Sequence, residues 1–472
     1  MNVLLLIVGL GIATMLLEVV HLRKLILPVV TIGLLAVIGI SFSEIYAIKH
    51  QVLSEQQTAY PNAFTKMLFF DITAWTNIII LSFATLCWII MHINYLNKAQ
   101  HLSDFIALSL FVLVGGVVLV AQVNFTMLFL GVEIVSIPVY IMVGSNKRDL
   151  WSNEAAFKYF IIGSFASCFM LLGIALIYGT TGTFETRFIG LMVQLSNSIN
   201  IQLLYFGLIL IFFTFAVKVA AVPFHFWSPD AYAGAPTPFT AFMAVIVKII
   251  FLAAAFRVFV ILFGSLNLIY VNIVLLVAVL SIVVGNIIGL TQTNIKKLLA
   301  YSGISHAGFV LLSFTYLNYN VNSVAAYYFA AYALSGLLAF WIMAKTNENN
   351  IDETIDGYKG LAFRNPLLAI GMTTALLSMA GIPPLAGFFA KYFILSNLIL
   401  SGKLWVAVVA ILASVIAVVY YLRVVITMYQ TTDEASKTPI QINWLNKIGI
   451  ILLIALNILF GIYPSIILNI FN

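Results

Sequence analysis

Charged residues are scarce in this chain of 472 residues, because Asp, Glu, Lys and Arg make up only 8% while hydrophobic residues make up 63%. A soluble domain carries about 25% charged residues to cover its surface. Apolar windows of about 20 residues, each long enough to cross about 30 Å of hydrocarbon, recur along the whole length. No long polar block is left for a soluble domain. The sequence therefore predicts an all-α polytopic membrane protein.

Cysteine and cofactor-binding motifs are also nearly absent. Cys87 and Cys168 each lie in an apolar window without metal or redox spacing, and we interpret both as small buried hydrophobic residues. The chain has no Walker loop, no dinucleotide fingerprint after a strand and no clustered Cys/His ligands. The stretch "GTTGTF" (179–184) has turn composition and is expected in a loop, so it is only a weak candidate for binding phosphate. Any pumping energy must come from an ion gradient or from partner subunits.

Fourteen membrane spans are predicted from the apolar windows, with boundaries set to within several residues. They begin near Val3, Leu25, Leu68, Asp104, Asn124, Ala155, Ile201, Pro238, Tyr270, Leu298, Val321, Pro366, Leu404 and Leu445.

The net charge of +6 is unevenly distributed among the loops. We number the loops that connect the predicted spans from the N-terminus. The even-numbered loops hold only Lys49, Lys66, Arg187 and Lys403. By the positive-inside rule, odd loops face the cytoplasm and both termini lie outside it. The charge thus reflects topology, and we expect no nucleic-acid partner. The odd loops hold Arg23, Lys24, Lys98, Lys147, Arg148, Lys296, Lys297, Lys345, Lys359, Arg364, Arg423, Lys437 and Lys447.

The span positions predict an internal repeat. Spans four to eight (104–263) and nine to thirteen (270–428) start at offsets of about 166 residues, close to a fixed period as repeats require. Five is odd, so the second unit enters the membrane from the opposite side, as in inverted-repeat transporters. A three-span segment (1–100) precedes the units and one span (444–472) follows them. Coincidence of loop lengths is the alternative.

Proline interrupts the seventh and twelfth spans at corresponding places. The seventh runs into "KVAAVPFHFW" and the twelfth into "AGIPPLAGFF". Proline removes a backbone donor and clashes with the preceding turn, which breaks a helix. A broken helix in a membrane lies against protein or a wet cavity. Matched breaks therefore indicate a transport site, and simple proline kinks are the alternative.

Five basic residues remain outside the loops: Lys158, Lys218, Lys248, Arg257 and Lys391. Lys158 follows Glu154 by four residues, which favours a surface ion pair. Arg257 lies near the end of the eighth span. Its long side chain either snorkels to the membrane interface or stays within the span, and the sequence favours neither.

Lys218, Lys248 and Lys391 fall deep within apolar spans. A charge at mid-bilayer costs about 2.5–3.5 kcal/mol on insertion scales. A desolvated lysine releases its proton readily, so we interpret these three as proton-transfer residues. The alternative is a charge that only holds helices together.

Glu133 is the only acidic residue deep in an apolar span, in "FLGVEIVSIPVYIM", and Lys218 is its expected partner. His306 takes the corresponding place in the second unit, and His225 lies in the first broken segment. A histidine relays protons near neutral pH or is simply hydrogen-bonded in the core. Neighbouring polar groups suited to holding water are Tyr301, Ser302, Ser305 and Thr237.

Several long motifs resemble the antiporter-like membrane subunits of respiratory complex I. They are "QTNIKKLLAYSGISHAGFVLL" (292–312), "PFHFWSPDAYAGAPTPFTAF" (223–242), "LSMAGIPPLAGFFAKYFIL" (377–395) and the acid-bearing "LGVEIVSIPVYIM". The resemblance covers essentially the whole chain. Within this family the chain looks most like the subunit N branch, because "APTPFTAF" has its form, Lys391 stands where subunit M is expected to carry glutamate, and no lateral helix follows.

This resemblance implies a proton-translocating subunit of NADH:quinone oxidoreductase in which Glu133 pairs with Lys218, Lys248 lies on a central polar axis and Lys391 is the terminal lysine. It implies that NADH, flavin, iron–sulfur clusters and quinone bind other subunits, and that this chain holds no cofactor or metal. The expected partners are subunits M, K and J and the lipid bilayer. The expected location is a bacterial inner membrane, rather than an organellar one.

Three alternatives remain open at this point. The chain could belong to a multisubunit cation/proton antiporter, whose large subunits look more like subunits L and M. It could belong to a ferredoxin- or hydrogenase-linked relative of complex I, because the electron donor binds elsewhere. A purely structural scaffold is disfavoured by the buried lysines and the matched helix breaks.

Overall fold

The computed structural model describes residues 2–50, 67–98, 102–195, 200–263, 268–316, 321–431 and 439–471. Within them, twelve helices are long and apolar enough to cross a membrane, and two shorter apolar helices lie at 366–380 and 386–400. The all-α polytopic prediction is confirmed. The predicted loop residues Lys66 and Lys437 lie outside the described residues.

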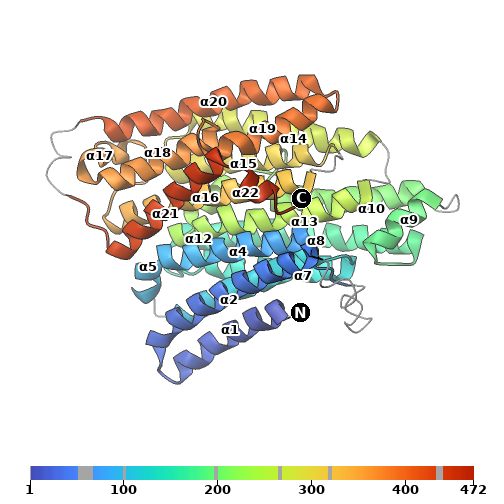
Figure 1. The fold of residues 1–472 in the computed structure, drawn as a ribbon, viewed down its shortest axis with the longest axis horizontal. Helices are drawn as coiled ribbons and strands as arrows, with labels where there is room; N and C mark the ends of the chain where they lie inside the picture. The colour runs from blue at the N-terminus through green and yellow to red at the C-terminus, as the bar shows by residue number, and fades with distance from the viewer. Residues whose placement is uncertain are drawn as a thin grey trace.

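The N-terminal helices form one flank of the bundle, and α20 forms the opposite flank (Figure 1). The pair α1 and α2 exposes many large apolar side chains, among them Leu5, Leu16 and Ile32, as expected for a surface that meets lipid. The helices of this segment are α1 (Asn2–Val19), α2 (Arg23–Lys49), α4 (Ile72–Met91) and the short α5 (Ile93–Lys98).

The first predicted five-span unit contains a helix pair in place of its fourth span. Helix α10 ends at Lys218, and α11 begins at Trp227 after a turn that holds the cis bond Val222–Pro223. The helices are α6 (Leu102–Ala121), α7 (Phe125–Val143), α8 (Leu150–Thr181), α9 (Thr186–Leu195), α10 (Ile201–Lys218), α11 (Trp227–Gly234), α12 (Thr237–Phe242), the π-helix η2 (Met243–Val247) and α13 (Lys248–Phe263).

The second predicted unit is interrupted in the same way, between α18 and α19, where Pro383–Pro384 is cis. Its tenth-span helix, α15, is as long as a span but more polar, which explains why it is not among the twelve. The helices are α14 (Leu268–Thr291), α15 (Ile295–Ser313), α16 (Val321–Glu348), the 3-10 turn η3 (Asp356–Tyr358), α17 (Leu361–Arg364), α18 (Pro366–Ala380), α19 (Ala386–Leu400) and α20 (Leu404–Tyr429), followed by α21 (Trp444–Ile462) and α22 (Ser465–Leu468).

Two isolated β-bridges match between the two units. Asn124 caps α7 and bridges Glu185, which follows α8, while Asn294 caps α15 and bridges Thr354, which follows α16. Thus the cap of the second helix meets the segment after the third helix in both units. The division into two repeats remains a prediction, and this correspondence supports it.

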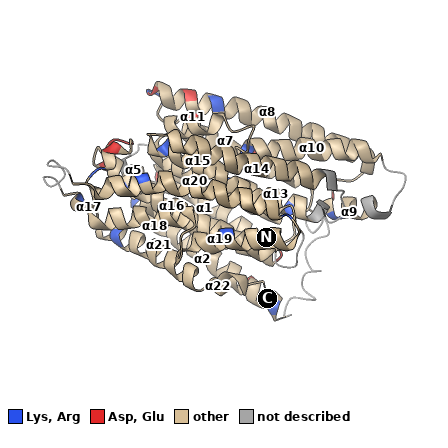
Figure 2. Cartoon of the chain, turned by 90° about the horizontal axis from the view of Figure 1, so that it is seen from above, with Lys and Arg blue, Asp and Glu red and all other residues tan. Residues whose placement is uncertain are grey.

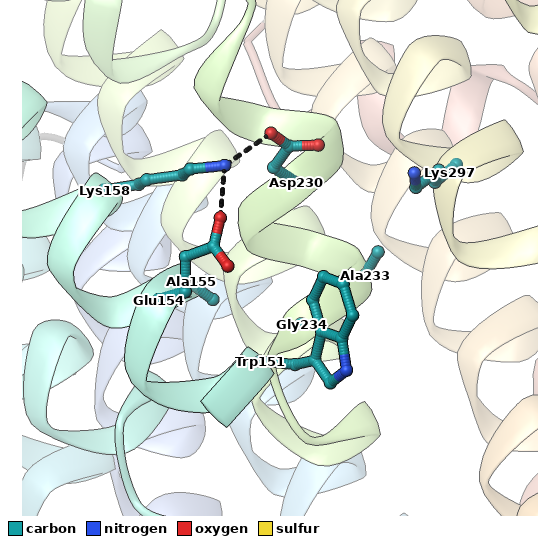
Figure 3. A pocket seen from close by; sticks show the side chains of 8 residues that line it. All are labelled: Trp151, Glu154, Ala155, Lys158, Asp230, Ala233, Gly234 and Lys297. Atoms are coloured by element: carbon teal, nitrogen blue, oxygen red, sulfur yellow. Dashed lines mark hydrogen bonds and ion pairs between the residues drawn. The ribbon is translucent and has the colours of Figure 1, made fainter. Parts of the chain in front are cut away.

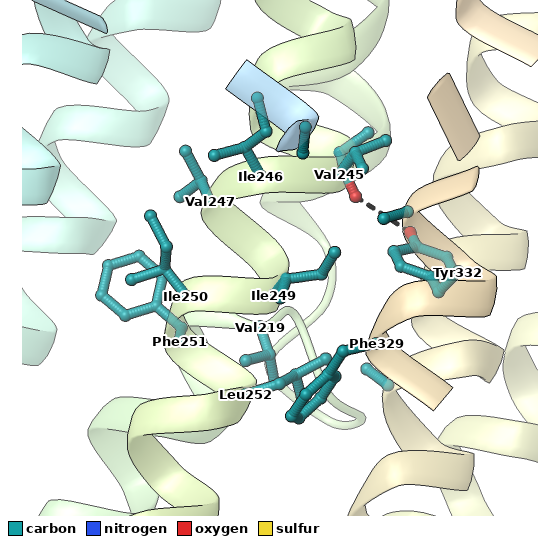
Figure 4. Close-up of a cluster of buried hydrophobic side chains, with 14 of the residues drawn as sticks. Val219, Val245, Ile246, Val247, Ile249, Ile250, Phe251, Leu252, Phe329 and Tyr332 are labelled. Carbon is teal, nitrogen blue, oxygen red and sulfur yellow. Dashed lines mark hydrogen bonds between the residues drawn. The ribbon is translucent and has the colours of Figure 1, made fainter. Parts of the chain in front are cut away.

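The core of the bundle lies along α12, η2, α13 and α16, which are buried almost throughout. Figure 4 shows the apolar side chains of η2 and α13, with Tyr332 of α16 beside them. The Tyr332 hydroxyl donates to the Ala244 carbonyl at 2.9 Å, inside the π-helical turn. A π-turn frees such a carbonyl from the α-helical ladder, and such turns often occur at functional sites.

The structure corrects three details of the sequence analysis. Helix α8 begins at Leu150 and runs to Thr181, so the first half of the predicted "GTTGTF" turn is helical. The loop predicted around Arg187 contains helix α9. Cys168 is exposed rather than buried, because it lies on the outer face of α8, while Cys87 is buried as predicted.

Charge is concentrated at the ends of the helices, and their middles are almost free of it (Figure 2). Most of the helical surface is uncharged, and α8 and α20 carry large exposed apolar side chains such as Phe165, Leu412 and Val415. This distribution fits a bundle that crosses hydrocarbon with its ends in the interfaces.

Candidate functional site

Glu133 lies in the middle of α7 and is half-buried. Its carboxylate accepts a hydrogen bond from the Ser167 hydroxyl of α8 at 2.5 Å. Among the described residues no ion pair joins Glu133 to Lys218, the partner that the sequence suggested. The two groups are instead linked through α7, because Ser136 and Tyr140 follow Glu133 at helical spacing on the same face.

Lys218 is the last residue of α10 and is buried, with its side chain pointing to α7. Its ammonium donates to the Ser136 hydroxyl at 2.9 Å and to the Tyr140 hydroxyl at 3.1 Å. It also lies 5.7 Å from the ring centre of Phe251 on α13. Lys218 therefore sits where the broken seventh span meets α7 and α13.

The helix is interrupted after Lys218, and the polar groups around this interruption form hydrogen bonds with protein groups. The Val222 amide donates to the Ser281 hydroxyl of α14 at 2.9 Å, and the Trp227 indole donates back to the Val217 carbonyl at 3.0 Å. Irregular backbone within a membrane persists where neighbouring protein bonds it. The turn after Lys218 thus contacts the second predicted unit through Val222, while Lys218 itself stays bonded within the first.

Lys248 is the first residue of α13, directly after the π-helix, and only 2% of it is exposed. Its ammonium has no hydrogen-bond partner among the described residues. It lies 5.7 Å from the ring centre of Tyr232, and a methyl group on Gly303 would come within 2.8 Å of it. Glycine at 303 therefore leaves room for the ammonium against α15.

His306 lies one turn beyond Gly303 on α15 and is buried. Its Nδ1 is 2.7 Å from the Tyr328 hydroxyl, and its ring centre is 5.2 Å from that of Tyr332. Both tyrosines belong to α16. His306 is thus hydrogen-bonded in the core. It also lies on α15 between Gly303, which borders Lys248, and Phe309, which borders Lys391.

Lys391 lies on α19 and is buried. Its ammonium donates to the Ala380 carbonyl, the last residue of α18, at 2.9 Å, and it lies 5.1 Å from the ring centre of Phe309. Phe309 is one turn beyond His306. The break between α18 and α19 supplies the carbonyl that holds this lysine.

A row of neighbouring residues runs between these groups across the bundle. Lys218 contacts Phe251, which is one turn from Lys248 on α13. Lys248 borders Gly303, and α15 then presents His306 and Phe309 at intervals of three residues up to Lys391. A rise of 1.5 Å per residue places Gly303 and Phe309 about 9 Å apart along the helix. The structure therefore brings Glu133, Lys218, Lys248, His306 and Lys391 into one row.

Three further residues that the sequence singled out, His225, Ser302 and Arg257, are not part of this row. His225 is buried in the turn after α10, and its ring centre lies 6.4 Å from that of Tyr301. Ser302 contacts the Tyr421 hydroxyl of α20. Arg257 is buried, and it reaches the end of the helices through Asp71 at 3.0 Å and the Phe69 and Gln122 carbonyls.

Lys158 pairs with Glu154 at 2.8 Å as predicted, and also with Asp230 of α11 at 2.9 Å. All three line a pocket of about 380 Å³ between α8, α11 and the start of α15 (Figure 3). Trp151 and Lys297 form its other walls. The pocket lies at one end of the helices, and its charges are about half exposed, which favours a surface role for Lys158.

Two basic residues that the sequence placed in loops are buried. Lys296 pairs with Glu353 at 2.7 Å, and Lys345 pairs with Glu348 at 2.7 Å. Sequence reasoning missed Lys296 because its partner follows α16, far away along the chain. No group of three His, Cys, Asp or Glu residues suited to a metal ion occurs in the described ranges.

Comparison with known proteins places these features in a family. The profile of the NADH:quinone oxidoreductase/Mrp antiporter transmembrane family matches residues 121–417, the part of the chain that contains every residue of the row. The NADH-quinone oxidoreductase subunit N of Flavobacterium psychrophilum is 38% identical over 99% of this chain and all of that protein.

Solved structures show the same fold. A chain of the respiratory complex I from Thermus thermophilus with bound aureothin superposes with a TM-score of 0.82 at 27% identity, covering 99% of this chain and 98% of that one. A chain of the Mrp complex from Dietzia sp. DQ12-45-1b gives 0.87 over 99% and 95%, at 19% identity, and this likeness concerns the fold alone.

Proposed function

The chain belongs to the NADH:quinone oxidoreductase/Mrp antiporter family of membrane subunits, and we propose that it serves as subunit N of a proton-pumping NADH:quinone oxidoreductase. It carries protons across the membrane while quinone is reduced in other subunits. The relatives named as subunit N match it over nearly its full length, which supports this function over that of a free-standing antiporter.

One observation carries the proton-transfer role. Lys218, Lys248 and Lys391 are buried in the row, and none has a carboxylate within 4 Å among the described residues. Burial without a counter-charge raises the free energy of a charged group, and a lysine lowers that free energy by releasing its proton. Each of these lysines is therefore suited to alternate between the ammonium and the neutral amine.

The row gives these alternations an order. We propose that the Glu133 carboxylate, held by Ser167, favours the ammonium of Lys218 through Ser136 and Tyr140. When this influence weakens, the proton passes from Lys218 to the neutral amine of Lys248, and then by His306 to Lys391. A membrane potential opposes each charge by about 2.3 kcal/mol per 100 mV, which pKa swings of about two units in the carriers would match.

The electron-transfer groups belong elsewhere in this proposal. NADH, flavin, iron–sulfur clusters and quinone bind other subunits, and the chain purified alone carries no chromophore. Its neighbours are the antiporter-like subunit M and the small subunits K and J, in a bacterial inner membrane. Co-purification of these subunits would separate this complex from a ferredoxin- or hydrogenase-linked relative.

The function is tested with Lys218→Ala and Glu133→Gln in the assembled complex. Lys218→Ala removes a carrier, so NADH-driven proton uptake by vesicles falls strongly, together with quinone reduction if coupling is tight. Glu133→Gln weakens both rates less, because Lys218 keeps its hydroxyl partners. If Lys218→Ala assembles normally and both rates stay at the wild-type level, the pathway proposed through this subunit is wrong.

Orientation is tested with reporters fused to the chain. The loop charges predict that reporters after Lys147 and Lys297 lie in the cytoplasm, whereas those after Arg187 and at the C-terminus lie outside. A cytoplasmic C-terminus would contradict an even number of crossings with both termini outside.

A further inference from the structure

A buried ion pair closes the end of the molecule that is predicted to face the cytoplasm. Lys296 stands in the first turn of α15 with only 6% of its side chain exposed, and its ammonium lies 2.7 Å from Oε1 of Glu353. Glu353, in the segment after α16, keeps 25% of its side chain exposed. Lys296 is therefore buried inside the protein, while Glu353 lies at its aqueous edge.

The two carboxylate oxygens of Glu353 have different surroundings. Oε1 accepts from Lys296, from the Thr237 hydroxyl at 3.2 Å and from the Asn347 amide at 2.8 Å. Oε2 has no hydrogen-bond partner in the described part of the chain. One oxygen thus anchors the side chain, and the other is left to exchange protons.

Polar contacts continue from this pair toward Lys248. The Lys296 ammonium donates to the Ala235 carbonyl at 3.3 Å, and the Thr240 hydroxyl lies within hydrogen-bond distance of the same carbonyl and of the Tyr232 carbonyl. The Tyr232 ring in turn faces the Lys248 ammonium. The junction of α11 and α12 therefore supplies carbonyls suited to holding water between the pair and the row.

The opposite end of the molecule lacks this feature at the matching place. The Ile295 amide donates to the Glu353 carbonyl at 2.9 Å, and the Phe125 amide donates to the Phe184 carbonyl at the same distance. By this correspondence Phe184 takes the place of Glu353, and Thr126 takes that of Lys296. Phe184 stacks on Tyr178 with ring centres 4.3 Å apart. Among the described residues, the first unit thus has no ion pair that matches Lys296–Glu353 at these two positions.

We propose that the Lys296–Glu353 pair is the gate through which protons from the cytoplasmic side reach Lys248. A proton from bulk water binds Oε2, neutralises the carboxylate and loosens its hold on the Lys296 ammonium. The proton then leaves Oε2 through water along the α11–α12 junction and binds the neutral amine of Lys248, which restores the carboxylate. This step rests on the proposed function of the row.

The gate is tested in the assembled complex with Glu353→Gln and Glu353→Asp. Glutamine keeps the shape and the anchoring bonds but does not exchange a proton, so NADH-driven proton uptake falls about tenfold. This fall is smaller than the roughly 10²–10⁴-fold contribution of a positioned acid–base group, because Lys248 and the rest of the row remain intact. Aspartate keeps the carboxylate and retains most of the rate. Lys297→Ala is the matched control, because Lys297 is the adjacent lysine and lines the outer pocket instead.

Access is measured directly with a cysteine at buried Thr240 in a chain whose Cys87 and Cys168 are replaced by alanine. An impermeant thiol reagent is applied to the cytoplasmic face. With the pair intact, labelling is slow at rest and faster during NADH turnover, and Lys296→Ala makes it fast at rest. This readout remains available if Glu353→Gln does not assemble.

The outcomes separate the gate from the function of the row. Wild-type pumping in Glu353→Gln, or equal losses in Glu353→Gln and Glu353→Asp, overturns the gate while Lys218→Ala still blocks pumping. Labelling at residue 240 that depends neither on turnover nor on Lys296 overturns it as well. Wild-type pumping in Lys218→Ala instead overturns the proposed function itself.

Discussion

The basic residues at the ends of the helices and those in the middle have different partners. Near the ends, Arg257 pairs with Asp71, Lys296 with Glu353 and Lys345 with Glu348, each within 3.0 Å. In the middle, Lys218 donates to hydroxyls and Lys391 to a carbonyl, while Lys248 has no hydrogen-bond partner in the described residues.

This difference indicates two uses of buried positive charge. A cation beside a carboxylate keeps its proton, because losing it would leave a buried anion unpaired. Hydroxyls and carbonyls hold an ammonium without fixing its charge, and a hydroxyl accepts or donates to suit the neutral amine as well. End cations therefore stay charged, whether they hold the fold together or, at Lys296, close the proposed gate, and middle lysines are free to change protonation.

Lys248→Met should reduce proton pumping more than any other substitution, because Lys248 is the middle lysine with no hydrogen-bond partner in the described residues. Methionine fills a similar volume without charge, and replacing a buried charge by an apolar group is often neutral or stabilising. We expect proton uptake to fall by about a hundredfold, since a positioned proton carrier is lost. The complex should assemble with an unchanged or higher melting temperature.

The matching measurement is thermal unfolding of the purified variant complex beside its proton uptake. A melting temperature several degrees lower would show that Lys248 contributes to the fold like an end cation. Normal uptake would show that protons bypass it.

Arg257→Ala tests the other side of the comparison. The change leaves the Gln122 and Phe69 carbonyls without their side-chain donor and Asp71 with only the Ala74 amide. Breaking a fully buried ion pair costs about 3–5 kcal/mol, and the cost here is smaller because 35% of the Asp71 side chain is exposed. We expect a lower melting temperature and less assembled complex, with the protons pumped per NADH unchanged in the complex that remains. A lower ratio at normal stability would place Arg257 on the proton path.

Hydropathy located the helices because a membrane span must be apolar over most of its length. Proline located the breaks after Lys218 and before Lys391, since its chemistry acts locally. The π-helix before Lys248 was not predicted, because Met243–Val247 contains neither glycine nor proline. The carbonyl that this turn frees is bonded by Tyr332 of α16, a contact between distant parts of the chain.

The lysines of the row were found because a charge in an apolar window is conspicuous. Their neighbours were not, since Gly303, Phe251 and Phe309 resemble ordinary span residues. The expected Glu133–Lys218 ion pair also required helix facing that the sequence does not contain. Lys296 was counted as a loop charge because the positive-inside rule registers position along the chain and not burial.

Lys158→Ala should change pumping and stability least, because Lys158 is an exposed cation at the end of the helices. Lys158 has two carboxylate partners, like the end cations, but 39% of its side chain is exposed. Water screens such pairs, and an exposed ion pair contributes about 1 kcal/mol or less. Glu154 and Asp230 would remain solvated in the open pocket, so the melting temperature should fall by a few degrees at most. Proton uptake and NADH:quinone turnover of the variant complex, measured beside Lys218→Ala, should stay near the wild-type rates. A loss as large as that of Lys218→Ala would place Lys158 in the proton path despite its exposure, and exposure would then no longer separate the two classes of cation.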